Sequence, residues 1–226
     1  MRYLTMLLLL VVALAGGCHI KMHDVVGSGV RQTQQRELPA FTSISMQGAF
    51  DIDVVCQKPQ SFEIEGDDNL LPLITTEVRG NVLHIGTNKS FSVHEPIKIR
   101  IAAGNLEAIS TNGAGSINVT GLKNDKFEID ANGATAFRVA GETKLIDIDT
   151  NGAGKIDAHK LRASRGVVDA KGVARVDVNV ADQLDVTVSG PSHVTYQGDP
   201  VLNKTVHGPG SVDKKEAEVS WLVNRE

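Results

Sequence analysis

The chain of 226 residues has little cysteine, few aromatic residues and no excess of positive charge. It holds two cysteines, aromatic residues make up 4% of it, and its net charge is −4. A weakly acidic chain is a poor partner for nucleic acid. Its histidines show no metal-ligand spacing, and no nucleophile elbow, phosphate loop or HExxH helix is present. Composition and motifs therefore favour a binding or structural protein over an enzyme.

A long hydrophobic run is also missing. Residues 4–17 are uncharged and apolar, but they are too few to span a bilayer comfortably, and Arg2 precedes them. The pattern predicts a signal peptide over residues 1–17. Small residues lie directly before Cys18, as in the lipobox at which a cysteine is acylated and the chain is cut. Cys18 is therefore the predicted lipidation site, and an ordinary signal peptide is the alternative.

The segment that follows is polar and without pattern, and we expect residues 18–37 to form a lipidated N-terminus and a flexible tether. His19, not aspartate, follows the cysteine, which by resemblance to sorted lipoproteins favours the outer membrane. With Cys18 acylated, Cys56 has no partner for an internal disulfide. No nearby sequence supplies the positive charge that activates a thiol, so we expect Cys56 to be buried.

The clearest feature of the remaining chain is a six-residue pattern that occurs six times with glycine in its second position. Successive glycines are separated by 20, 19, 20, 18 and 18 residues. Such a near-constant period is the signature of a repeat architecture. The glycines are Gly113, Gly133, Gly152, Gly172, Gly190 and Gly208.

Residues at fixed distances from these glycines share their chemistry. Four places after each glycine stand aliphatic or aromatic residues, among them Ile117, Phe137, Ile156 and Val176. Polar residues alternate with the apolar ones, which is the period of two of a half-buried strand. One such unit cannot bury its own apolar row, but stacked units can. We therefore predict an all-β, single-domain parallel β-helix or β-solenoid with about 18–20 residues per coil. A β-propeller is disfavoured because its blades need about twice this period.

The domain is expected over residues 38–215, with residues 216–226 as a C-terminal tail or cap. Around Gly48 the same template recurs, which predicts an additional coil. Between Gly48 and Gly113 there is room for about three longer turns. Residues 67–72 are expected to interrupt them with a loop or a short helix.

Residues 41–54, 66–74, 76–85 and 106–115, taken in that order, resemble the head GIN domain family, which is labelled as putative auto-transporter adhesins and often found as bacterial lipoproteins. The likeness runs from about Arg36 to Gly210. It implies a solenoid fold and an adhesin-like role, and it supplies no catalytic residues to carry over. Cys56 departs from the family pattern, in which a small or polar residue is commoner.

Acidic residues recur at two places before the glycines and form the candidate cation-binding or ligand-binding face. Stacked carboxylates repel unless a cation screens or bridges them, and calcium is the candidate ion. The alternative is a solvated face neutralised by Lys126, Lys144 and Lys160. The acidic candidates are Glu128, Asp130, Asp147, Asp149, Asp169 and Asp185.

We predict a non-catalytic cell-envelope lipoprotein that is anchored in a membrane and binds a glycan or another envelope protein through its stacked faces. No cofactor is required by this interpretation, calcium being optional. One alternative is a carbohydrate-active β-helix enzyme, a lyase or hydrolase that uses the carboxylates. The other is a structural envelope protein. The open ends of a solenoid would allow copies to pair.

Overall fold

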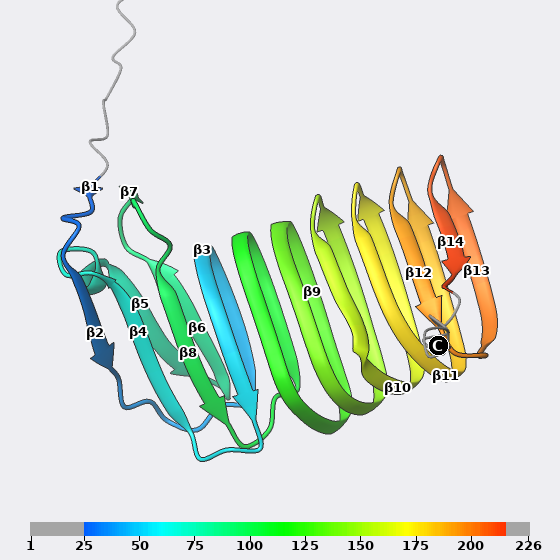
Figure 1. Ribbon diagram of the computed structural model, residues 1–226, viewed down its shortest axis with the longest axis horizontal. Helices are drawn as coiled ribbons and strands as arrows, with labels where there is room; N and C mark the ends of the chain where they lie inside the picture. The colour runs from blue at the N-terminus through cyan, green and yellow to red at the C-terminus, as the bar shows by residue number, and fades with distance from the viewer. Residues whose placement is uncertain (1–24, 216–226) are drawn as a thin grey trace, which may run out of the picture.

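The structure is a computed structural model, and it describes residues 25–215 (Figure 1). The predicted signal peptide, the lipidation site Cys18 and the tail at 216–226 lie outside these residues. Apart from one short 3-10 helix, the described elements are strands, so the predicted all-β class is confirmed. The elements are β1 (Val25–Val26), β2 (Arg31–Gln35), β3 (Ser43–Cys56), β4 (Ser61–Asp67), η1 (Leu71–Leu73), β5 (Ile74–Arg79), β6 (Val82–Thr87), β7 (Phe91–Ser92), β8 (Lys98–Ala103), β9 (Ala108–Gly152), β10 (Lys155–Gly172), β11 (Arg175–Ser189), β12 (His193–Gln197), β13 (Val201–His207) and β14 (Ser211–Lys214).

The repeats pair with one another in parallel and in the register that the glycines predict. Ile156 lies opposite Phe137 on one side and Val176 on the other, and Val176 lies opposite Val194. Each of these partners is one repeat away in the sequence. Each repeat, from one glycine to the next, is called a coil below. The coils lie side by side along the long axis of the molecule, with the glycines at one edge and rounded bends at the other (Figure 1).

The core lies between the two layers of strands. Ile117, Phe137, Ile156 and Val176 are each at most 1% exposed, and they belong to one continuous apolar cluster. Burying such a side chain contributes roughly 1.5–3 kcal/mol. Because each coil adds its apolar row to the next, stacking supplies the burial that a single coil lacks.

Glycine is required at the sharp edge because neighbouring backbones approach closely there. Gly133 has φ +111°, and a Cβ atom at this position would lie 2.2 Å from the carbonyl oxygen of Gly113. At Gly152, with φ +148°, a Cβ would lie 2.3 Å from the carbonyl oxygen of Gly133. A Cβ at these distances would force the neighbouring backbones apart, so these positions strongly favour glycine.

The first half of the domain differs from the expected series of longer turns. Gly48 pairs directly with Gly113, which confirms the additional coil. Of the strands between them, only β6 and β8 continue the parallel stack, each beside one part of β3. β4 pairs antiparallel with both β2 and β8, and β5 pairs antiparallel with β6. The turn from β5 to β6 holds Gly80 and Asn81, both at positive φ, a combination that favours a tight hairpin. The expectation of three further turns was therefore wrong, and the large sheet is mixed.

The expected tether is also shorter than predicted. β2 joins the sheet beside β4, and β1 pairs in parallel with β7. Arg36 fastens the same segment, because its guanidinium donates hydrogen bonds to the carbonyl oxygens of Leu71 (3.0 Å) and Ile74 (2.8 Å) and to Thr76 Oγ1 (3.0 Å). Burial lowers the pKa of Arg36. The domain thus begins before residue 38.

Two smaller expectations are confirmed. The interruption expected over residues 67–72 contains the start of η1. Cys56 is free and buried, and burial raises the pKa of its thiol to about 11. Within residues 25–215, no helix is long and apolar enough to cross a membrane.

Candidate functional site

The acidic residues predicted from the repeat gather on one layer of the stack, the layer of strands that precede the glycines. Asp149 and Asp169 are direct partners in neighbouring coils. Asp130 holds the same place one coil before Asp149, and it accepts a hydrogen bond at 3.4 Å from Ser110 Oγ in the coil before that. Side chains two residues apart point to the same side of a strand. The second acidic row, which includes Glu128 and Asp147, therefore runs beside the first.

Two lysines neutralise this group. Lys171 Nζ lies 2.8 Å from Asp169 and 3.4 Å from Asp149. Lys126 pairs with Glu128 and lies 3.5 Å from Asp147. Hydrogen bonds to Asp169 and to Glu128, respectively, raise the pKa of Lys171 and Lys126 above that of a free lysine. Each lysine thus bridges carboxylates that belong to different coils.

The other two lysines expected to neutralise the face do not do so. Lys144 pairs instead with Asp125, at 2.8 Å, and Lys160 forms no salt bridge with any residue in the range 25–215. Lys171 was not predicted in this role. It occupies the first position of a repeat hexapeptide where Asn151 stands one coil earlier, and that substitution was the signal that could have identified it.

Asp185 lies apart from the other acidic candidates. Val167 occupies its place in the intervening coil, between Asp147 and Asp185. The Asp185 carboxylate accepts hydrogen bonds from Gln183 Nε2 and Asn203 Nδ2, both at 2.8 Å. The structure therefore brings together five of the six acidic candidates and separates the sixth.

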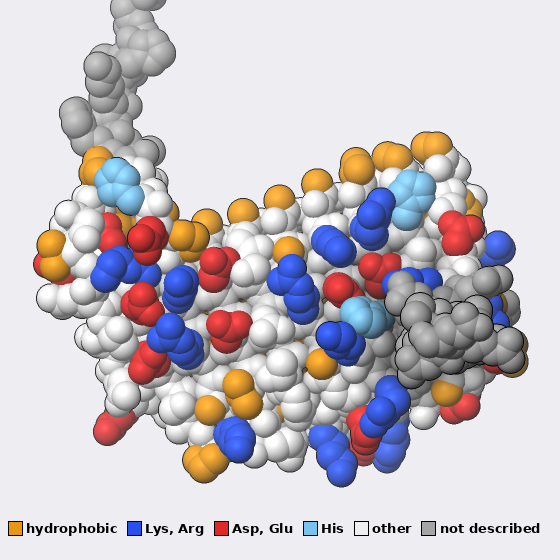
Figure 2. Space-filling model, viewed as in Figure 1, with side chains coloured by type: hydrophobic (Ala, Val, Ile, Leu, Met, Phe, Trp, Pro, Cys, Tyr) orange, Lys and Arg blue, Asp and Glu red, His pale blue; other side chains and the backbone are white. Residues whose placement is uncertain are grey.

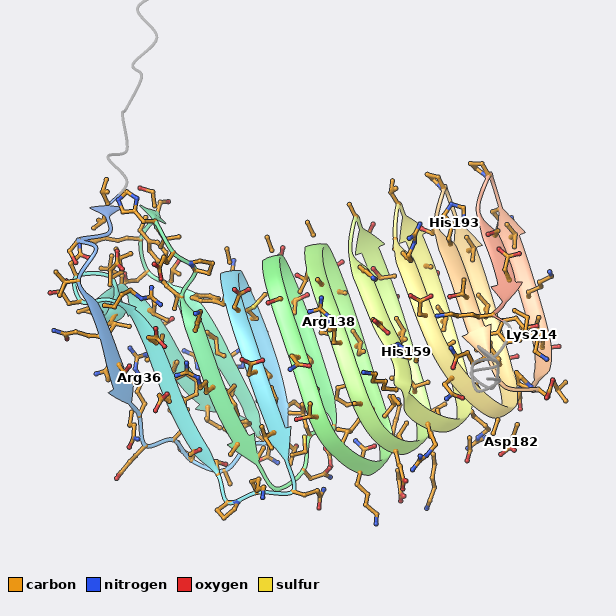
Figure 3. All side chains as sticks on the ribbon, in the orientation of Figure 1. Arg36, Arg138, His159, Asp182, His193 and Lys214 are labelled. Atoms are coloured by element: carbon orange, nitrogen blue, oxygen red, sulfur yellow. The ribbon has the colours of Figure 1, made fainter. Side chains whose placement is uncertain are left out.

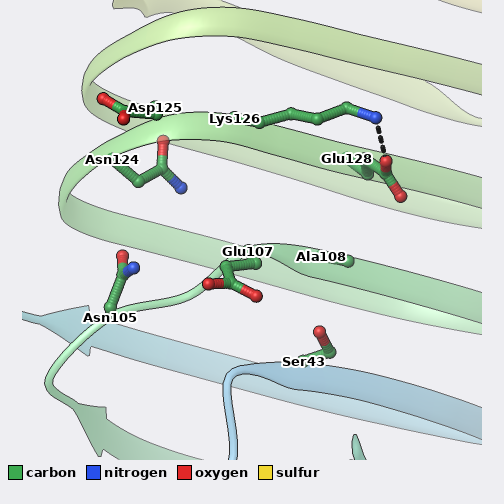
Figure 4. Close-up of a pocket in the computed structure, with 8 residues that line it drawn as sticks. All are labelled: Ser43, Asn105, Glu107, Ala108, Asn124, Asp125, Lys126 and Glu128. Atoms are coloured by element: carbon green, nitrogen blue, oxygen red, sulfur yellow. Dashed lines mark hydrogen bonds and ion pairs between the residues drawn. The ribbon is translucent and has the colours of Figure 1, made fainter.

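Two hollows of about 540 Å³ each adjoin one another on this layer and share Glu128. The first lies where the repeats meet the N-terminal strands, and Figure 4 shows its carboxylates, amides and lysine around an open surface. Its lining consists of Ser43, Asn105, Glu107, Ala108, Asn124, Asp125, Lys126 and Glu128. The second lies over the acidic rows and is lined by Glu128, Ile129, Asp130, Asn132, Asp147, Asp149, Asn151 and Lys171. We call the two together the acidic groove.

Repeat analysis missed the first hollow because much of its lining comes from outside the repeat columns. Ser43 belongs to β3, and Asn105 and Glu107 precede β9. Glu107 accepts a hydrogen bond from Thr42 Oγ1 at 3.1 Å, and Asn124 donates one to the carbonyl oxygen of Leu106 at 2.6 Å. These contacts hold the Glu107 carboxylate and the Asn124 amide in place.

The acidic groove offers carboxylate and amide acceptors beside amide and ammonium donors. This set suits hydroxyl, amide and amino groups of a polar ligand. Over residues 25–215, no three His, Cys, Asp or Glu side chains are grouped so as to hold a metal ion. The carboxylate pairs that face each other between coils are instead bridged by Lys126 and Lys171.

The opposite layer carries a different surface. Arg138, His159 and His193 project from it (Figure 3). Acidic and basic side chains alternate over this layer (Figure 2), and several pair locally, as His159 does with Asp157. Asp53 lies on this layer and accepts a hydrogen bond from Asn118 Nδ2 at 3.3 Å.

Solved structures with the same fold include putative bacterial adhesins. One from Bacteroides fragilis NCTC 9343 superposes with a TM-score of 0.68 and 22% identity, over 84% of this chain and 100% of the other. A putative adhesin from Parabacteroides merdae ATCC 43184 gives 0.53 and 17% identity, over 85% and 99% of the two chains. No curated protein matches the sequence. The family model described as putative auto-transporter adhesin, head GIN domain, matches residues 40–200, and the chain belongs to that family.

Proposed function

We propose that this protein is a non-catalytic, adhesin-like module of the bacterial cell envelope that binds an extended polar polymer, such as a glycan, along the acidic groove. The observation that carries the proposal is the continuity of the groove. Two adjoining hollows share Glu128 and extend over several coils. A polymer with a repeating unit can contact successive coils, so that weak contacts add along its length.

The two lysines of the groove are better suited to binding than to base catalysis. General acid–base catalysis works best with a group that titrates near the operating pH. Lys126 and Lys171, the two lysines of the groove, have pKa values raised by hydrogen bonds to their carboxylate partners. They hold their protons more firmly than free lysines, which suits a fixed donor better than a catalytic base.

The proposal extends to architecture and location. We propose that the parallel-paired coils form a β-solenoid, which the antiparallel N-terminal strands close at one end. A strand stack of this kind needs such a cap, because open edges invite pairing with other chains. The signal peptide over residues 1–17 and lipidation at Cys18 would export the chain and anchor it, and His19 favours the outer membrane.

A glycan array that includes polyuronates and amino-sugar polymers tests the proposal, with and without calcium. We expect at least one polymer class to bind the full chain. We expect the variant Asp149→Asn to lose about tenfold or more in affinity, since a charge-assisted hydrogen bond contributes roughly 1.5–3 kcal/mol. Asp53→Asn makes the same chemical change on the opposite layer and should leave the affinity unchanged.

The enzyme alternative is decided by incubating the same polymers with the protein and measuring new chain ends. Turnover that disappears in Asp149→Ala would overthrow the binding role. Equal losses in Asp149→Asn and Asp53→Asn would also contradict the proposal, because they would place the binding site outside the acidic groove. An absence of binding together with a membrane-integrity defect on deletion would favour a structural role.

A further inference from the structure

The glycine edge of the stack exposes an unbroken line of apolar side chains. In each coil the residue directly after the glycine is exposed, and in every coil it is Ala, Val or Pro. Figure 2 shows this line as a row of hydrophobic side chains along one edge. Val173 is 62% exposed. The apolar edge consists of Ala49, Ala114, Ala134, Ala153, Val173, Pro191 and Pro209.

The core does not account for this line. Each of these side chains is exposed at the bend and lies outside the apolar core cluster. At about 4.8 Å per coil the seven side chains extend over about 29 Å. A row of exposed apolar side chains of this length indicates a contact surface.

Basic side chains flank the C-terminal half of this edge. Lys155 and Arg175 are exposed direct partners in neighbouring coils, two residues beyond Ala153 and Val173. Neither forms a salt bridge with any residue from 25 to 215. His193 continues their row and lies near the same edge (Figure 3).

Between Lys155 and Lys98, which is the exposed partner of Asp51 in β8, this row carries no positive charge. The place that corresponds to Lys155 in the β3 coil holds Asp51, which accepts a hydrogen bond from Ser116 Oγ at 2.6 Å. Ser116 itself occupies the same place in the next coil. The paired cations Lys155 and Arg175 are therefore specific to the C-terminal half, and Lys98 stands alone at the other end of the row.

The N-terminal end of the described chain lies at the same edge. β1 and β7 lie on the side of the molecule where the glycines are found (Figure 1), and Val26 and Val93 there are 59% and 41% exposed. From Cys18 to Val25 the chain can extend over at most about 25 Å. An anchor at Cys18 would thus hold the N-terminal end of this edge within about 25 Å of a bilayer.

We propose that the apolar edge and its flanking cations contact the surface of an anionic phospholipid membrane, so that the module lies along the bilayer and its two layers stand out from it. Apolar side chains that enter the interface together with Lys and Arg at the headgroups are the usual means of peripheral membrane binding. The arrangement leaves the acidic groove accessible from the side. The inference goes beyond the polymer-binding function and shares with it only the expected anchor.

The test places an environment-sensitive fluorophore on the edge. The full chain, as the cell produces it, carries a single added cysteine at Val173→Cys, while the buried Cys56 stays unlabelled. Asp182→Cys, at the opposite edge (Figure 3), is the matched control. Each protein is mixed with vesicles of phosphatidylcholine alone or with phosphatidylglycerol added, with and without a quencher in the acyl chains.

We expect the label at position 173 to shift to the blue and to be quenched only with phosphatidylglycerol-containing vesicles, whereas the label at position 182 stays in water. The double substitution Lys155→Glu and Arg175→Glu should weaken this response about tenfold or more, as should high salt. These two residues lie away from the core, so circular dichroism should show the fold unchanged.

Three results would overturn the proposal: a label at position 173 that stays in water with anionic vesicles, equal responses at positions 173 and 182, or a blue shift without lipid that grows with protein concentration. The last would assign the edge to pairing with a second copy of the chain. Mass spectrometry must show that Cys18 is acylated in both labelled proteins, because a free Cys18 thiol would also take the label. Polymer binding is measured separately on the array, so failure of either proposal is recognised independently of the other.

Discussion

The glycine edge allows a direct test of how closely the coils approach, because three glycines isolate the two effects of adding a methyl group. At Gly104 a Cβ would meet no atom within 4 Å, and φ is not in the left-handed range. At Gly80 the space is equally open but φ is +55°. At Gly133 φ is +111° and a Cβ would lie 2.2 Å from the carbonyl oxygen of Gly113. Substitution by alanine thus adds no penalty at Gly104, conformational strain alone at Gly80, and strain together with a clash at Gly133.

The expected magnitudes follow from these differences. Gly104→Ala should stabilise the protein by about 0.4–1 kcal/mol, because it reduces the entropy of the unfolded chain. Gly80→Ala adds a cost of roughly 1–2 kcal/mol for left-handed backbone and should be mildly destabilising. Gly133→Ala adds a further cost of about 1–3 kcal/mol for overpacking against backbone that cannot yield. We expect a net loss of roughly 2–4 kcal/mol for this last substitution, from the strain and overpacking costs together.

Thermal and urea unfolding of the full chain, followed by circular dichroism, measure these changes. For a protein of this size 1 kcal/mol corresponds to about 2–4 °C in Tm, so Gly133→Ala should lower Tm by roughly 5–15 °C. Gly104→Ala should not lower Tm at all. If Gly133→Ala lost no more stability than Gly80→Ala, neighbouring coils would not approach each other at this edge and the reasoning would be refuted.

Three further predictions concern single side chains. Cys56 should resist thiol reagents at pH 8 until the protein unfolds, and a native thiol that reacts freely would contradict its burial. Because the pKa of the folded thiol is raised to about 11, stability should also fall as pH rises from about 8.5 toward about 11, where the thiol is ionised in the unfolded chain but not in the folded one. Arg36→Met should cost about 1.5–3 kcal/mol in urea unfolding, because buried carbonyl oxygens lose a charged donor. The control Arg79→Met removes an exposed ion pair with Glu77 and should change stability by less than about 0.5 kcal/mol. Equal effects would mean that Arg36 does not stabilise the N-terminal segment. Lys171→Met should cost about 0.5–1 kcal/mol of stability at neutral pH and low salt, because the Asp149 and Asp169 carboxylates then repel each other without a cation between them. This loss of stability should shrink in high salt. A loss that does not depend on salt would mean that the lysine acts through packing alone.

The repeat half of the fold could be predicted because its information is local and periodic. A fixed spacing of glycines sets the register, and the apolar columns follow from it. The same alignment placed Asp149 and Asp169 in one column, and they are indeed partners. It also placed Val167 between Asp147 and Asp185, so the isolation of Asp185 could have been read from the sequence.

Most of the N-terminal half could not be predicted in the same way, because β4 pairs antiparallel with β2 and β8 across long stretches of chain. Arg100 meets Glu63 at 2.6 Å and Glu65 at 3.0 Å, and no periodicity connects these positions. The turn at Gly80 and Asn81 was a local signal for a hairpin that the search for coils overlooked. Polarity alone suggested a tether before residue 38, but polar strands such as β2 can lie at the edge of a sheet, where both faces need not be buried.

Successive coils lie beside one another at a constant spacing, and distances between spin labels measure that spacing. Ser116 and His193 occupy equivalent outward positions four coils apart, and Ser211 occupies the next one. Spin labels are attached to cysteines at positions 116 and 193, and then at 116 and 211. We expect the two label-to-label distances to reflect about 19 Å and about 24 Å of strand stacking, an increase of about 5 Å per coil. Distances that fail to increase from the first pair to the second would contradict this arrangement.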